Sequence, residues 1–251
     1  MSAMERELAQ TLEAVKTAYF DAQGAACDYA LLASSPERAQ LAACLLQLES
    51  FDVQRAHVPA QMAFWINVFN AAVLCDATEL LDAKRVKDVE AFFARRRLWI
   101  GPHGYSLDDI EHGLLRGNAP KQGSRRPPMA RDDPRLECTP MVLDERVHFA
   151  LHSACRSSPP LRIFEAGRLD RLLEDAATDY VRRTVRVERS GAVLVLPRLF
   201  RWFAGDFGDD SGIVEFVAAR LEDEATVEMI DRRRGSVSLR YHEFDWTLNR
   251  R

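Results

Sequence analysis

The sequence predicts a single α+β domain in which a helical N-terminal third packs on a mainly antiparallel sheet. Helical spacing of apolar residues dominates the first 81 positions, whereas short strand-like runs appear only after position 146. Turn signals between those later runs favour hairpins. The composition changes once, at residues 117–134, and a boundary there would leave all the strands on one side. We therefore expect one domain over residues 1–251.

The first third of the chain has the pattern of packed helices. Apolar residues recur every three to four positions between Leu8 and Tyr19, which is typical of an amphipathic helix. Ser35 followed by Pro36 has the serine cap and first-turn proline of a helix start. Residues 61–81 are apolar on almost every side, so this helix should be central and covered by other elements.

Later elements are shorter. Ser106 and Asp109 have the spacing of a helix cap and open an expected helix over residues 107–116. Residues 117–134 are rich in glycine, proline and arginine and predict a long surface loop or lid. Beyond that loop we expect, in order, a strand over 147–151, a helix over 169–181, a hairpin of 185–188 with 192–196 across Ser190-Gly191, a helix over 197–203, a helix capped by Ser211 and running to 221, and a hairpin of 226–230 with 236–241.

Composition excludes several classes of protein. A net charge of −4 argues against a general nucleic-acid binder, which would be basic. No run approaches the roughly 18 apolar residues of a membrane span, and the N-terminus lacks the apolar core of a signal peptide. Five cysteines at irregular spacing form neither a disulfide framework nor a CxxC metal site. We expect a soluble cytoplasmic protein without nucleic-acid or membrane partners.

The segment from residue 147 to residue 161 is the richest in reactive side chains. An apolar run leads into a polar stretch that a double proline ends. Its candidate residues are His148, His152, Ser153, Cys155 and Ser158. A thiol or hydroxyl becomes a nucleophile when a base lies beside it, and histidine is the usual base. The segment predicts either a catalytic site or a hydrogen-bonded scaffold before a turn.

A second candidate lies in the helix over residues 107–116. Glu111 beside His112 resembles a general base with an orienting carboxylate, but adjacent residues of an α-helix do not face each other. The two would therefore act through a third group. No HxxxH or HExxH spacing is present, and we expect neither a metal nor another cofactor.

The apolar central helix also carries two amides. Asn67 and Asn70 stand three residues apart on one face, and a buried amide without partners costs about 1–3 kcal/mol. We expect them to clamp neighbouring loop backbones rather than to contact substrate. The residues assigned to binding or to the scaffold of the site are Trp65, Asn67, Asn70, Arg116, His152 and Ser158.

The C-terminal part offers anchors rather than further chemistry. Trp246 lies close to the end of the chain and should dock on the core, because a large aromatic residue rarely hangs free. Trp202, Asp206 and Phe207 form a similar cluster, for which we also favour a structural role.

Several motifs, taken together, resemble the family called domain of unknown function 547. They are FWINVFNA at 64–71, the segment 106–116, DPR at 133–135, the segment 147–161, the elements around Leu196-Pro197, Trp202 and Asp206-Phe207, and FDWTLN at 244–249. The family's signature, a histidine followed by two cysteines, implies a thiol site. Here the cysteine positions hold Ser153 and Ser158, while Cys155 stands where the family usually has alanine. The thiol mechanism therefore does not carry over at the matching positions.

Two functions stay open. The first is a hydrolase or acyl-transfer enzyme in which His148 and Glu111 or His112 converge with the loop from Ser153 to Ser158. Its nucleophile would be Ser153 or a shifted Cys155. The second is a non-catalytic module that binds a small molecule, a peptide or a protein, which the loss of the family's cysteines favours. A buried helix followed later in the chain by a histidine segment also resembles the layout of papain-like hydrolases and transglutaminases. This analogy concerns the layout alone.

Overall fold

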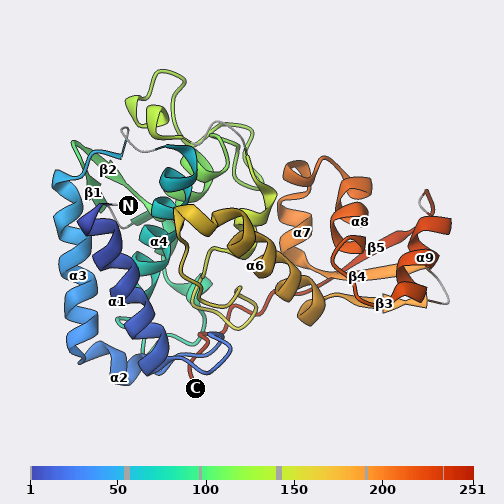
Figure 1. Ribbon diagram of the computed structural model, residues 1–251, viewed down its shortest axis with the longest axis horizontal. Helices are drawn as coiled ribbons and strands as arrows, with labels where there is room; N and C mark the ends of the chain where they lie inside the picture. Colours follow the sequence, from blue (N-terminus) through green and yellow to red (C-terminus); the bar gives the residue numbers. More distant parts are fainter. Residues whose placement is uncertain (1, 54–56, 96–97, 140–142, 190–191, 234) are drawn as a thin grey trace.

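A computed structural model describes almost the whole chain (Figure 1). The described residues are 2–53, 57–95, 98–139, 143–189, 192–233 and 235–251. The expected turn at Ser190-Gly191 lies outside them. The helices are α1 (Ala3–Tyr19), α2 (Tyr29–Ala33), α3 (Pro36–Gln47), α4 (Val58–Ala77), α5 (Phe92–Arg95), α6 (Leu169–Thr184), α7 (Arg198–Trp202), α8 (Asp210–Ala218) and α9 (Glu224–Arg232). The strands are β1 (Leu98–Ile100), β2 (His103–Tyr105), β3 (Arg186–Glu188), β4 (Val193–Pro197) and β5 (Ser238–His242).

Helix α4 is the centre of the helical part, as its apolar sequence predicts. Helices α1 and α3 pack on it, and its residues from Ala60 to Ala77 are buried. By length and composition α4 could cross a membrane, but 89% of that apolar window is buried inside the protein, as in a core helix. Ser35 caps α3 as expected, because its Oγ accepts a hydrogen bond of 3.1 Å from the Arg38 amide.

The sheets are small, and the α+β class is confirmed. Strands β1 and β2 form an antiparallel hairpin beside α3, whereas β3, β4 and β5 form a three-stranded sheet. Figure 1 shows this second sheet at the end of the molecule opposite α1 and α3, with α7, α8 and α9 beside it. The hairpin of β3 and β4 is confirmed, but β5 pairs with β4 in parallel, so this sheet is mixed.

The predicted second hairpin is wrong. Residues 226–230 belong to helix α9, which Asp223 caps by accepting a hydrogen bond from the Thr226 amide. Thr226 and Ile230 are buried while Glu228 between them is exposed, which fits one helix face, because in a strand all three would share a face. Ser211 is not the cap of α8 either. Asp209 accepts from the amides of residues 211 and 212 in that role.

The predicted strand over residues 147–151 is also wrong. Residues Glu145–Phe149 form a short 3-10 helix, η6, and Asp144 caps its start. The chain beyond η6 is irregular because its backbone groups bond to a side chain instead of a neighbouring strand. The Asn70 amide donates to the Ala150 carbonyl at 3.0 Å, and its oxygen accepts from the His152 amide at 2.8 Å. His148 therefore lies in η6, and His152 lies in the irregular chain after it.

The C-terminal segment docks on the core, as Trp246 predicts. The backbone carbonyl of Thr247 accepts from the Arg156 amide, and that of Trp246 accepts from the Val86 amide, each at 2.9 Å. This segment therefore lies against the irregular chain that follows η6. It brings Phe244 and Trp246 to the same side of the protein as His148.

Candidate functional site

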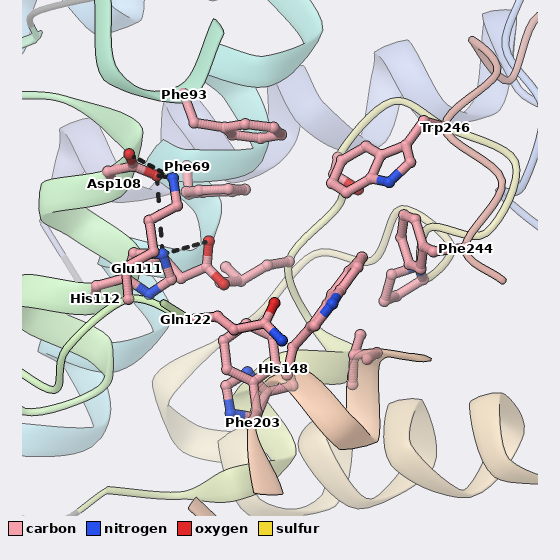
Figure 2. A pocket seen from close by; sticks show the side chains of 16 residues that line it. Phe69, Phe93, Asp108, Glu111, His112, Gln122, His148, Phe203, Phe244 and Trp246 are labelled. Atoms are coloured by element: carbon pink, nitrogen blue, oxygen red, sulfur yellow. Dashed lines mark hydrogen bonds and ion pairs between the residues drawn. The ribbon is translucent and has the colours of Figure 1, made fainter. Parts of the chain in front are cut away.

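A pocket of about 230 Å³ gathers most of the predicted polar residues (Figure 2). It lies between the helix that begins at Asp109, the 3-10 helix η6, helix α7 and the C-terminal segment. Its walls are formed by Phe69, Phe93, Asp108, Glu111, His112, Lys121, Gln122, His148, Leu151, Ser153, Pro159, Leu199, Trp202, Phe203, Phe244 and Trp246. Lys121 and Gln122 belong to the predicted loop or lid over residues 117–134, which therefore forms part of the wall.

A π-helix presents Glu111 and His112 to the pocket. This element, η4, spans Asp109–Leu115, and Ser106 caps the helical turn that leads into it, because its Oγ accepts from the Asp109 amide at 3.1 Å. In a π-helix the amide bonds to the carbonyl five residues earlier, so each turn holds more residues than an α-helix. Adjacent side chains of a π-helix therefore point in more similar directions than those of an α-helix. His112 Nε2 lies 3.9 Å from Glu111 Oε2. The expectation that they could act only through a third group assumed an α-helix.

His112 is held as a neutral imidazole. Arg116 Nη1 lies 3.0 Å from His112 Nδ1, and a guanidinium can only donate, so Nδ1 carries no proton. Burial and the Arg116 charge lower the pKa of His112 to about 4. Its Nε2–H then faces Asp108, whose Oδ1 is 3.8 Å away, and Glu111.

Asp206 joins the two histidine regions. Its carboxylate accepts from Arg116 Nε at 2.6 Å and Nη2 at 2.9 Å, and His148 Nε2 lies 2.8 Å away. Burial acts to raise the pKa of Asp206, but the hydrogen bonds from His148 and Arg116 outweigh it and lower that pKa to about 2. The ionised carboxylate therefore fixes a proton on His148 Nε2.

The other ring nitrogen of His148 has no hydrogen-bond partner among the described residues. Burial lowers the pKa of His148, so the ring is neutral and Nδ1 keeps a lone pair. The ring stacks on Phe203 with a centroid distance of 3.8 Å. The side chain is 0% exposed, so Nδ1 lies behind the surface of the pocket and not on it.

Glu111 is the less compensated carboxylate of the pocket. Asp108 forms an ion pair with Lys121 at 2.8 Å, whereas Glu111, in the described residues, has only the neutral His112 within ion-pair distance. Its side chain is 18% exposed. Burial raises the pKa of Glu111.

The predicted nucleophiles are not paired with His148. Cys155 Sγ lies 3.3 Å from Ser153 Oγ, and burial raises the pKa of this thiol to about 12, so it stays protonated. The ring contacts of His148 in the described chain are with Asp206, Phe203 and Phe207. Ser153 lines the same pocket, but its hydroxyl bonds to Cys155 and not to a base.

His152 and Ser158 serve the scaffold. His152 Nδ1 lies 2.8 Å from the Pro159 carbonyl, which can only accept, so Nδ1 carries the proton. Nε2 then accepts from Asn249 at 3.4 Å. Ser158 Oγ accepts from the Ser153 amide at 2.8 Å. These bonds fix the loop that follows His148.

The site residues predicted on α4, Trp65, Asn67 and Asn70, also lie outside the pocket wall. Asn67 bonds to both the carbonyl and the amide of Phe164, at 2.8 and 3.0 Å, and Asn70 bonds to both sides of residue 151 as described above. Trp65 donates to the Cys138 carbonyl at 3.2 Å. The two asparagines are thus backbone clamps, in agreement with the interpretation we favour.

Two parts of the site were missed from the sequence. Asp206 was expected to be only an anchor, although it orients His148 from 58 positions further along the chain. The aromatic wall of Trp202, Phe244 and Trp246 was likewise expected to be structural. The sequence motif that contains Trp202 and Asp206-Phe207 pointed to this part of the site. It does not show which side chains these residues contact. Over the described positions, no cluster of three or more His, Cys, Asp or Glu side chains could hold a metal ion.

Fold and site together define an α+β domain with a buried histidine–carboxylate pair at an aromatic-walled pocket. Residues 53–181, about half of the chain, match the family described as "Protein of unknown function, DUF547", and the chain belongs to that family. The matched region contains α4, η4 and η6, whereas Asp206 and Trp246 lie beyond it. No curated protein and no solved structure matches the chain, so the papain-like layout stays a prediction.

Proposed function

We propose that this protein is a ligand-binding module whose pocket holds a small organic molecule between Glu111 and the aromatic wall. The observation that carries the proposal is a formed pocket in which the partly exposed Glu111 carboxylate lies opposite Phe244 and Trp246. The His148 side chain is 0% exposed, so it supports the wall from behind, and Asp206 fixes its ring there.

Covalent acyl transfer has less support. It needs a nucleophile beside a base, and the buried Cys155 thiol stays protonated while Ser153 bonds to that thiol. Both groups are accounted for by contacts within the loop. Binding requires neither of them.

A fluorescence and thermal-shift screen of small organic molecules tests the proposal, because Trp202 and Trp246 line the pocket. Gln122 is exposed and points into the pocket in Figure 2, so Gln122→Phe should block binding without unfolding the protein. Gln47→Phe, an exposed position on α3, is the matched control. Ligands that bind the protein and both variants equally would show that the pocket is not the site.

A second candidate function is hydrolysis without a covalent intermediate. Glu111 lines the pocket with a pKa that burial raises, so it could take a proton from a water molecule there. The test is turnover of a panel of small esters and amides. If the protein is such a hydrolase, Glu111→Gln should abolish turnover while circular dichroism stays native, and probes that label nucleophilic serine or cysteine should not react.

A further inference from the structure

The pocket has two chemically different sides. Figure 2 shows Asp108, Glu111 and His112 on one side, with Phe244 and Trp246 opposite them. The aromatic side is continuous, because Phe244 lies 4.7 Å from Trp246 and 5.0 Å from Trp202 between ring centroids. A ligand in the pocket therefore contacts a carboxylate at one end and aromatic rings at the other.

The charges of the pocket leave one carboxylate without a cation. Lys121 is held by Asp108 at 2.8 Å, and Arg116 is held by Asp206 at 2.6 Å. His112 and His148 are neutral. Among the described side chains, no lysine or arginine lies within 4.0 Å of Glu111, so a ligand that supplies a positive charge would compensate it.

The acceptor at this end that has no cation within ion-pair distance among the described residues is the Glu111 carboxylate, which accepts when ionised. The donors beside it, His112 Nε2–H and the Lys121 ammonium, face the carboxylates of Asp108 and Glu111. An ammonium group donates to Glu111, whereas a carboxylate or phosphate would meet another anion. Aromatic faces add to this preference, because their quadrupole attracts cations.

We propose that the ligand of this pocket is a small organic ammonium ion, with its nitrogen at Glu111 and its carbon skeleton against Trp202, Phe244 and Trp246. The inference rests on the proposed binding function and specifies its ligand class. A cavity of about 230 Å³ suits a compact amine rather than a folded peptide segment.

Three molecules of similar shape and different charge test this directly. Benzylamine, benzyl alcohol and benzoate are titrated into the full chain at pH 7.5 by calorimetry and tryptophan fluorescence. Benzylamine should bind at least tenfold more tightly than benzyl alcohol, and benzoate should bind most weakly. An equal or better affinity for benzyl alcohol or benzoate, blocked by Gln122→Phe, would overturn the cationic class while leaving the binding function intact.

Charge variants separate recognition from folding. Glu111→Gln keeps the shape of the side chain and should weaken benzylamine binding at least tenfold, with benzyl alcohol unchanged. Gln122→Lys places a second cation at an exposed position of the wall and should also weaken benzylamine. Glu49→Gln, an exposed position outside the pocket, should alter neither affinity.

The remaining outcomes also decide the question. Unchanged benzylamine affinity in both Glu111→Gln and Gln122→Lys would overturn the inference. So would the absence of benzylamine binding to the unmodified chain. The binding function itself fails only if the wider screen finds no molecule whose binding Gln122→Phe blocks, so the two failures are distinguishable.

Discussion

Asp206 is the residue on which the arrangement of the pocket most depends. One carboxylate satisfies Arg116 through two hydrogen bonds and fixes the tautomer of His148. The Arg116 and Asp206 side chains are only 6% and 7% exposed, so neither charge could be compensated by water. Asp206 thus connects Arg116, at the end of the π-helix, with His148 on η6.

Replacing Asp206 by asparagine should destabilise the protein by about 3 kcal/mol, because it leaves the buried Arg116 charge without its partner. Urea denaturation followed by circular dichroism measures the change. Asp88→Asn is the control, since its ion pair with Arg85 is about half exposed and should contribute less than about 1 kcal/mol. Equal effects of the two substitutions would contradict the importance of burial.

Two buried histidines should make the fold sensitive to acid. The pKa values of His112 and His152 are lowered to about 4, mainly by burial, from an ordinary value of 6.5. Between these pH values the unfolded chain binds protons that the folded chain does not, so stability is present above pH 6.5 and is lost as the pH falls toward 4. Glu111, with a raised pKa, acts in the opposite direction.

The expected loss is at most about 1.4 kcal/mol per pH unit for each histidine. Urea midpoints at pH 7, 6 and 5 should fall steadily, and the His152 ring resonances should not titrate above pH 5. A constant midpoint over this range would show that neither histidine resists protonation.

At the scale of elements, the path between α7 and α8 decides where Asp206 lies. Asp206 belongs to the 3-10 helix η9 (Ala204–Phe207), which precedes α8. A Cβ at Gly212, in the first turn of α8, would overlap the backbone carbonyl oxygen of Phe207. The close approach of this turn to η9 therefore requires glycine and holds the segment that carries the carboxylate.

Gly212→Ala should destabilise the protein by about 2–3 kcal/mol, because the backbone of η9 must shift to make room. It should also weaken ligand binding, because Asp206 holds His148 behind the pocket wall. Gly205→Ala is a matched control inside η9, where a Cβ would meet nothing within 4 Å. Thermal unfolding and ligand titration on both variants separate the two effects, and identical behaviour would refute this reasoning.

Prediction of the elements succeeded where local chemistry was sufficient. Ser35 caps α3 and the α4 helix is buried as the sequence indicates. It failed at residues 147–151, where an apolar run has the composition of a strand. The hydrogen-bonding partner of Ala150 and His152 is Asn70, which lies 80 and 82 positions away from them in the chain. The composition of residues 147–151 cannot indicate a partner so distant in the sequence.

At the scale of the whole molecule, the C-terminal segment ties distant parts together. Asn249 accepts from the Tyr29 hydroxyl at 2.7 Å and donates to the Ala25 carbonyl at 2.6 Å. Its backbone bonds to Cys27 and to Ala154, so the N-terminal helices and the loop beyond η6 meet at this residue. Phe244 and Trp246 of the aromatic wall lie on the same segment.

Deletion of residues 247–251 should therefore lower the free energy of unfolding by at least about 3 kcal/mol, because several buried hydrogen-bonding groups lose their partners. Denaturation of the shortened chain measures the loss. Arg250→Ala, which removes one exposed side-chain bond to Leu81, should change stability by about 0.5 kcal/mol or less. A shortened chain as stable as the full chain would show that the segment only rests on the surface.

The sequence alone determined the helical N-terminal part, the central position of α4, the α+β class, and the two segments that hold Glu111, His112 and His148. These features depend on periodicity, caps and motifs within a few residues. Only the tertiary structure decided that His148 pairs with Asp206 rather than with Ser153 or Cys155, and that Trp202, Phe244 and Trp246 face Glu111. The physical reason is that a buried polar group takes whichever partner the fold brings to it, and here that partner is 58 residues away.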